Sequence, residues 1–127
     1  MSAIILVVDD DTTIVHLLKE GLEDEGYIVI EGFDGAMALQ LARSQRPDLL
    51  IMDVNMPMTN GLHALEFMRK NPETAEIPVL FLTGAASSTV YPLIEKDSLV
   101  TFIKKPVDLE ELFSLVRQLL ARNPRKA

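Results

Sequence analysis

Cysteine is absent from the chain, which excludes a disulfide framework, a zinc site with thiolate ligands and a cysteine nucleophile. Long hydrophobic runs are absent too. The first apolar stretch, residues 4–8, is too short for a signal-peptide core or a membrane span, and no basic residue precedes it. These absences predict a cytoplasmic protein that does not associate with a membrane.

Basic residues are scarce, since 12 lysines and arginines face 19 aspartates and glutamates, for a formal net charge of −7. A protein that binds nucleic acid through its phosphates needs a basic face, and only Arg122, Arg125 and Lys126 form any cluster. We therefore expect no direct binding to nucleic acid. The 127 residues, 48% of them apolar, suit one globular domain. We place that domain at residues 3–122, followed by a short basic tail at residues 123–127.

Five short apolar runs are present, and amphipathic segments separate them. The runs predict strands at residues 4–8, 27–31, 48–52, 79–82 and 100–103. Three of the runs are nearly continuous in large apolar residues, which is typical of parallel strands that helices cover on both faces. The second run is the weakest and predicts a strand at the edge of the sheet.

The amphipathic segments predict helices. Thr12 or Thr13 is expected to cap the first helix, Asp34 caps the second, and the last begins at Asp108. Pro92 cannot donate an interior helical hydrogen bond, so we favour a late start of the fourth helix, with Pro92 in its first turn, over a kink. The spacing predicts these inward residues: Ile14, Leu17, Leu18, Leu22, Ala38, Leu41, Ala42, Leu62, Leu65, Phe67, Met68, Leu109, Leu112, Leu115, Val116 and Leu119.

Alternation of strands and helices, repeated five times, predicts a doubly wound α/β fold: a single five-stranded parallel sheet with helices on both faces. Ligands of such sheets bind beyond the carboxyl ends of the strands. Polar residues stand at those ends. Asp9 and Asp10 follow the first run, Asp53 the third and Thr83 the fourth, and Lys105 comes just after the fifth.

Three carboxylates at one edge repel one another, by roughly 4 kcal/mol for two charges 4 Å apart at an effective dielectric of 20. Such a cluster needs a raised pKa or a bound cation, and oxygen ligands with room for water and phosphate suit Mg²⁺. Beside Mg²⁺, Asp53 can attack a phosphoryl donor, while Lys105 offsets charge and Thr83 donates a hydrogen bond. Taken singly, each residue is more often an ordinary turn, cap or solvated residue. Their joint occurrence favours phosphoryl transfer.

Four motifs occur in order: ILVVDDD at residues 5–11, LIMDVNMP at 50–57 with Gly61 beyond it, LTG at 82–84 and FIKKP at 102–106. Together they resemble the CheY-like receiver domain of response regulators in two-component signalling, over about residues 3–120. The resemblance implies a flavodoxin-like fold with strand order 2-1-3-4-5.

The resemblance also implies a role for each motif residue. Asp53 would be the phosphoacceptor. Mg²⁺ would be held by Asp10 directly, by Asp9 mainly through water, by Asp53 and by the backbone carbonyl of Asn55. The Asn55 side chain would influence dephosphorylation.

Three further positions gain roles from the same resemblance. Thr83 and Phe102 would form a switch pair, in which the hydroxyl moves to the phosphate and the ring turns inward. Lys105 would pair with the phosphoryl group, and the Lys105–Pro106 peptide would be cis. Residues 97–99 depart from the small Gly-Ala pair usual before the fifth strand, which predicts an unusual readout at the output surface of the fourth helix, fifth strand and last helix.

The implied function is a Mg²⁺-dependent switch. It would accept a phosphoryl group from a histidine kinase or histidine phosphotransfer protein and change shape at the fourth helix, fifth strand and last helix. It would dephosphorylate itself slowly, without being a turnover enzyme, and act on an unidentified downstream protein as a monomer or phosphorylation-dependent dimer. The chain would be a stand-alone receiver or part of a larger protein.

Two other interpretations stay open. A haloacid-dehalogenase-type phosphohydrolase also uses an aspartate nucleophile with Mg²⁺, but it needs a second aspartate two residues later, where this chain has Asn55. A degenerate receiver that serves only as a scaffold would usually lack the acceptor, an acidic partner or the lysine, and none is missing here.

Overall fold

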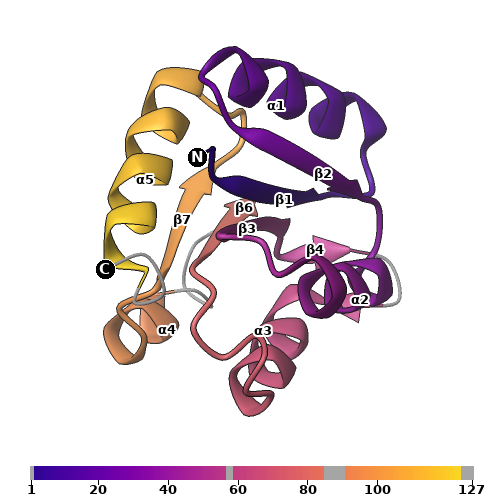
Figure 1. Cartoon of the computed structure of the whole chain (residues 1–127), viewed down its shortest axis with the longest axis vertical. Helices are drawn as coiled ribbons and strands as arrows, with labels where there is room; N and C mark the ends of the chain where they lie inside the picture. Colours follow the sequence, from indigo (N-terminus) through magenta and orange to yellow (C-terminus); the bar gives the residue numbers. More distant parts are fainter. Residues whose placement is uncertain (1, 57–58, 85–90, 124–127) are drawn as a thin grey trace.

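The computed structural model describes residues 2–56, 59–84 and 91–123. Strands and helices alternate along the chain (Figure 1). The elements are β1 (Ile4–Val8), α1 (Thr12–Asp24), β2 (Ile28–Gly32), α2 (Gly35–Gln45), β3 (Leu49–Asp53), β4 (Asn55–Met56), β5 (Thr59–Asn60), α3 (Gly61–Lys70), β6 (Val79–Thr83), α4 (Tyr91–Lys96), β7 (Val100–Lys104) and α5 (Leu109–Arg122).

The central sheet is parallel and has the order β2-β1-β3-β6-β7. Counted along the chain, its strands therefore follow the predicted order 2-1-3-4-5, with the weak second strand at an edge. A separate antiparallel pair, β4 with β5, was not predicted. Each of its strands has only two residues, too few to leave a periodic pattern in the sequence.

Helices cover both faces of the sheet, as the near-continuous apolar strands predicted. Helices α1 and α5 pack on one face, and α2 and α3 pack on the other (Figure 1). Alternate residues of β1 divide between the two cores, with Leu6 and Val8 on the α2 and α3 side and Ile5 and Val7 on the α1 and α5 side. Within the described ranges, no helix is long and apolar enough to cross a membrane.

Two helices bury a different stripe from the one we predicted. In α1 the buried residues are Val15, Leu18 and Leu22, whereas Leu17 is 49% exposed. In α3 the stripe includes Ala64, and Phe67 is 51% exposed. The packed face is set by how the helix lies on the sheet, and both segments carry more apolar residues than that one face can hold.

The helix starts agree with the prediction except at α1. Asp34 and Asp108 cap α2 and α5, and α4 has Pro92 in its first turn. Residues 85–90, which precede α4, lie outside the described part. For α1 the cap is Asp11, not Thr12 or Thr13, because its Oδ1 accepts hydrogen bonds from the backbone of Thr13 at 2.9 Å and of Ile14 at 3.4 Å. The Lys105–Pro106 peptide is cis, as the resemblance implied.

The end of α5 is fastened to the amino-terminal edge of the sheet. Asn123, which we assigned to the basic tail, is 1% exposed, and its Nδ2 donates to the carbonyl of Asp48 at 2.9 Å. Asp48 in turn accepts a hydrogen bond from the backbone of Ile4 at 2.7 Å. Asn123 therefore belongs to the folded domain, and the rest of the predicted tail, residues 124–127, lies outside the described part.

Asn123→Ala is expected to destabilise the domain by about 1–3 kcal/mol, because it leaves the buried carbonyl of Asp48 without this donor. Urea unfolding followed by circular dichroism measures the change. Gln118→Ala is the control on the same helix, where the exposed side chain only approaches Ser114 at 3.4 Å, and its effect should stay within about 0.5 kcal/mol. Equal effects of the two variants would contradict the anchoring role of Asn123.

Candidate functional site

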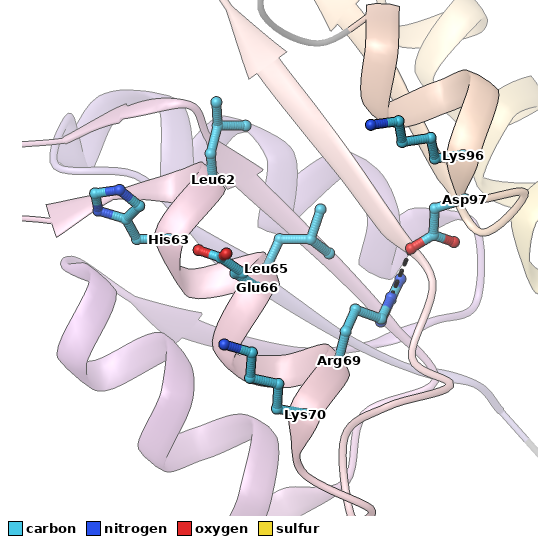
Figure 2. A pocket seen from close by; sticks show the side chains of 8 residues that line it. All are labelled: Leu62, His63, Leu65, Glu66, Arg69, Lys70, Lys96 and Asp97. Carbon is cyan, nitrogen blue, oxygen red and sulfur yellow. Dashed lines mark hydrogen bonds and ion pairs between the residues drawn. The ribbon is translucent and has the colours of Figure 1, made fainter.

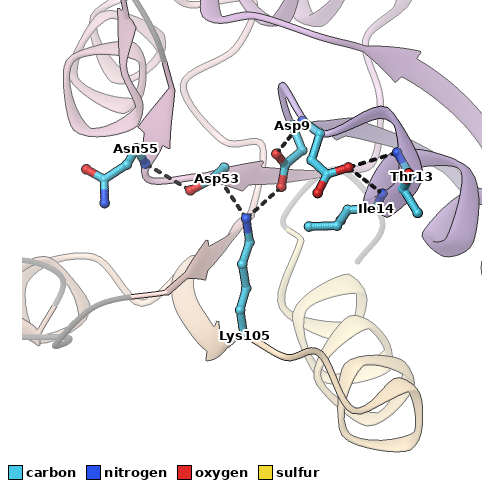
Figure 3. Close-up of polar contacts among 7 residues, drawn as sticks. Asp9, Thr13, Ile14, Asp53, Asn55 and Lys105 are labelled. Atoms are coloured by element: carbon cyan, nitrogen blue, oxygen red, sulfur yellow. Dashed lines mark hydrogen bonds and ion pairs between the residues drawn. The ribbon is translucent and has the colours of Figure 1, made fainter.

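The polar residues predicted to meet at the sheet edge do meet there (Figure 3). Strands β1 and β3 are neighbours, and pairing of Val8 with Met52 brings the next residues, Asp9 and Asp53, side by side. The last pair of β6 and β7 is Thr83 with Lys104, so Lys105 follows at the same edge. The topology of the sheet thus assembles the site from distant parts of the sequence.

Three carboxylates form a compact cluster. Asp9, Asp10 and Asp53 can each offer one oxygen such that these oxygens lie within 4.8 Å of one another. Asp9 is 0% exposed and Asp53 is 6% exposed, while Asp10 lies at the surface. Two of the three negative charges are therefore held away from bulk water. Because the protein interior screens charges poorly, their mutual repulsion is strong there.

Lys105 supplies the positive charge at this cluster. Its Nζ lies 2.8 Å from Asp53 Oδ2 and 3.0 Å from Asp9 Oδ2. The backbone of Lys105 donates to the carbonyl of Thr83 at 2.8 Å, which fixes the start of its side chain next to β6. The predicted convergence of the early and middle carboxylates with the late lysine is thereby confirmed.

Backbone amides hold the other oxygen of each buried carboxylate. Asp9 Oδ1 accepts from the amide of Asp11, and Asp53 Oδ1 accepts from the amide of Asn55, both at 2.9 Å. Each of these carboxylates therefore directs one oxygen to the backbone and the other to Lys105. The Asn55 side chain is exposed and points away from Asp53 (Figure 3).

The site perturbs two ionisable groups. Burial lowers the pKa of Lys105, but its close contacts with the carboxylates of Asp53 and Asp9 outweigh burial, so the pKa lies above the ordinary value. Desolvation and the neighbouring Asp9 carboxylate raise the pKa of Asp10, and the charge of Asp53 adds to this. The neighbouring carboxylates thus raise both pKa values, and for Asp10 desolvation is the larger cause.

The residues present fit a divalent cation. Three carboxylates and one ammonium leave two negative charges without compensation, which one doubly charged ion would balance. Asp9 Oδ2 is buried and has no aligned hydrogen-bond donor, although Lys105 Nζ lies near it. An all-oxygen set of few ligands suits Mg²⁺. Asp9, Asp10 and Asp53 are the side chains that would hold it, with the carbonyl of Asn55.

The roles of Thr83 and Phe102 as a switch pair stay a prediction. Thr83 ends β6 and is 2% exposed, in the strand next to that of Asp53. Phe102 is half-buried on β7 and packs against the core on the α2 and α3 side.

Two contributions to the site were not predicted from the sequence. Asp11, for which we predicted no role, holds Asp9 through its amide and caps α1 through its carboxylate. Gly61 lies directly against the end of β3, since a Cβ there would be 2.8 Å from the carbonyl oxygen of Asp53 and 3.2 Å from the ring of Phe81. Only glycine fits this close approach without a shift of β3.

Gly61→Ala is expected to destabilise the protein by about 1–3 kcal/mol and to shift the backbone of Asp53, because the added methyl group collides with main-chain atoms. Urea unfolding and the amide resonances of residues 52–55 measure the two effects. Gly84→Ala is the matched control, since its methyl group would meet no atom of the described residues within 4 Å. A stable Gly61→Ala protein with unchanged resonances would show that the close approach is not a constraint.

Comparison with known proteins identifies the class. The family of response regulator receiver domains matches residues 5–117, and the chain belongs to this family. It is 34% identical over 117 residues to the protein PilH of Pseudomonas aeruginosa, with 92% of this chain and 97% of PilH covered. It is 36% identical over 123 residues to the DNA-binding dual master transcriptional regulator RpaA of Synechocystis, with 95% of this chain but only 50% of RpaA covered.

Solved structures agree with this assignment. The CheY-like receiver domain protein of Methanospirillum hungatei superposes with a TM-score of 0.87 at 27% identity, with 100% of both chains covered. The chemotaxis protein CheY4 of Vibrio cholerae superposes with a TM-score of 0.85 at 29% identity, with 94% of this chain and 99% of that chain covered. The flavodoxin-like, CheY-like fold predicted from the sequence is confirmed.

Proposed function

We propose that the protein is a Mg²⁺-dependent phosphorylation switch that accepts a phosphoryl group on Asp53 from a histidine kinase or a histidine phosphotransfer protein. The observation that carries this proposal is the placement of Lys105 Nζ at 2.8 Å from Asp53 Oδ2 and 3.0 Å from Asp9 Oδ2. One ammonium thus contacts both the proposed acceptor and a proposed metal ligand. Membership of the receiver family supports the same function.

The proposed reaction uses the Asp53 carboxylate as the nucleophile. An oxygen of Asp53 attacks phosphorus, an O–P bond forms, and the P–N bond of the phosphohistidine breaks. The imidazole leaves with the electron pair and takes up a proton, and Asp53 becomes an aspartyl phosphate. Asp53 Oδ2 faces Lys105, whereas the amide of Asn55 holds Oδ1, so Oδ2 is the attacking atom.

Charge stabilisation comes from both the lysine and the metal. When bound, Mg²⁺ would offset the negative charge of the transferring group. Lys105, already within 3.0 Å of two carboxylate oxygens, would form an ion pair with a phosphoryl oxygen. Thr83 would donate its hydroxyl hydrogen to another phosphoryl oxygen, and Phe102 would turn inward as the hydroxyl moves.

The remaining parts of the proposal concern the signal. Phosphorylation would change the surface formed by α4, β7 and α5. An unidentified downstream protein would bind that changed surface, on a monomer or on a phosphorylation-dependent dimer. Water would then slowly hydrolyse the aspartyl phosphate, with Asn55 placed to influence the rate. Such a protein works in the cytoplasm and turns over no external substrate.

Phosphorylation by acetyl phosphate tests the proposal. Intact-mass measurement should show the addition of one phosphoryl group in Mg²⁺ and none in EDTA, and beryllofluoride should shift amide resonances around Asp53. No adduct in Mg²⁺, together with an unchanged spectrum, would exclude a phosphorylation switch. Steady turnover of phosphomonoesters would instead support the phosphohydrolase interpretation.

A further inference from the structure

A cavity lies between α3 and the carboxyl-terminal end of α4, and it has no residue in common with the carboxylate site (Figure 2). Side chains of α3 from Leu62 to Lys70 line one side, and Lys96 and Asp97 line the other. The volume is about 560 Å³, and most of its surface is apolar. Small-molecule sites commonly span roughly 300–1,000 Å³ and are mainly apolar with a few polar groups.

The wall of the cavity includes an ion pair between Arg69 and Asp97. Arg69 Nε lies 2.7 Å from Asp97 Oδ2, and Arg69 Nη1 donates to the carbonyl of Ile77 at 2.8 Å. The other oxygen of Asp97 accepts from the backbone of Leu99 at 2.9 Å. Arg69 and Asp97 therefore form a fixed wall, in which Nη2 of Arg69 is buried and has no hydrogen-bond partner among the described residues.

The two lysines of the cavity differ in their surroundings. Lys70 lies one helical turn after Glu66 on α3, so that an acidic neighbour offsets its charge in part (Figure 2). Lys96 stands on the opposite side, and among the described residues it makes no ion pair. Of the two acidic residues that line the cavity, Asp97 is engaged by Arg69, and Glu66 lies on α3 one helical turn before Lys70. Lys96 is thus an uncompensated positive charge beside an apolar surface, in a chain of net charge −7.

We propose that this cavity binds an amphipathic organic anion, with an alkyl or aryl body against Leu62 and Leu65 and a carboxylate at Lys96. An apolar body is favoured because Leu62 and Leu65 line the cavity and most of its surface is apolar. A negative head group is favoured because the free charge of the cavity is positive. This site is additional to the proposed phosphorylation switch and does not depend on it.

Octanoate, 1-octanol and octylammonium test the proposal, because they share one alkyl chain and differ in head-group charge. Each is titrated into the ¹⁵N-labelled full chain, and amide shifts of Leu65, Arg69 and Asp97 report the cavity. We expect saturable shifts with octanoate, affinity for 1-octanol lower by about fivefold, and weaker binding still for octylammonium. Equal affinities for the three compounds, or no saturable shift at these amides, would overturn the proposal.

Lys96→Met separates the charge from the apolar length of the side chain. It should weaken octanoate by about fivefold and leave 1-octanol unchanged, whereas the matched variant Lys70→Met should have a smaller effect because Glu66 already offsets that lysine. Equal effects of the two variants, or none with Lys96→Met, would contradict the assigned head-group position. Octanoate binding should persist in Asp53→Asn, which makes the outcome independent of the proposed phosphorylation.

Discussion

Asp53→Asn is expected to abolish Mg²⁺-dependent phosphorylation by acetyl phosphate, with no phosphorylated species left in the intact-mass spectrum. The side-chain amide of asparagine lacks the anionic oxygen that attacks phosphorus, so no acyl phosphate forms at this position. The fold should survive, because the amide oxygen can still accept from the backbone of Asn55 and Lys105 keeps its contact with Asp9 at 3.0 Å. Affinity for Mg²⁺ should also fall, by about tenfold or more, since one of three carboxylates is lost.

Asp34→Asn is the matched control for that substitution. It makes the same chemical change at an exposed carboxylate that caps α2, where asparagine is an equally good cap. This variant should be phosphorylated like the unaltered protein. If Asp53→Asn still gained a phosphoryl group at the same rate, the acceptor would be another residue and the proposed mechanism would be wrong.

Lys105→Met is expected to slow phosphorylation by about 10²–10³-fold, because it removes a fixed positive charge from the place where the phosphoryl group transfers. The same change should lower the free energy of unfolding by about 2 kcal/mol in EDTA, since the buried Asp9 and Asp53 lose their counter-charge. Saturating Mg²⁺ should restore much of that stability by mass action on the folded state. Single-turnover phosphorylation and urea unfolding with and without Mg²⁺ measure these effects.

Lys104→Met provides the comparison, because Lys104 is the exposed neighbour and makes no ion pair among the residues that the structure describes. It should change neither the rate nor the stability appreciably. Should both lysine variants slow the reaction equally, the overall charge of the loop, and not the contact of Lys105 with Asp53, would be responsible.

The site was predictable because it follows from topology and strand-end chemistry. Apolar runs predict the central strands, parallel strands end at one edge, and Asp9, Asp53 and Lys105 are the polar residues at those ends. Even the late start of α4 follows from local chemistry, since Pro92 fits only the first turn. Features that depend on local residue chemistry and on the apolar pattern of the sequence could therefore be predicted.

Features that depend on packing could not be predicted from the sequence. Leu17 and Phe67 fit an apolar stripe as well as Val15 or Ala64 does, and only the docked position of each helix decides which are buried. Asn123 looked like part of a polar tail, because its partner Asp48 lies 75 residues away in the sequence.

Close approaches left equally little trace in the sequence. In the sequence, Gly61 fits an ordinary helix start. Only the fold shows that a Cβ added at Gly61 would lie 2.8 Å from the carbonyl oxygen of Asp53. The ion pair of Arg69 with Asp97, which lines the cavity next to α3, joins a helix to a turn 28 residues later. Neither spacing corresponds to a local periodicity, so neither could be inferred in advance.

The central claim is that Asp9, Asp10 and Asp53 share one divalent cation next to Lys105. Paramagnetic broadening by Mn²⁺ in the ¹⁵N-labelled protein tests it most directly, because broadening depends steeply on distance from the ion. We predict selective broadening of the amides of residues 9–11, 53–55 and 105 at low Mn²⁺, reversed by excess Mg²⁺ and weakened in Asp53→Asn. Broadening centred on another part of the chain, or none that Mg²⁺ reverses, would contradict the account.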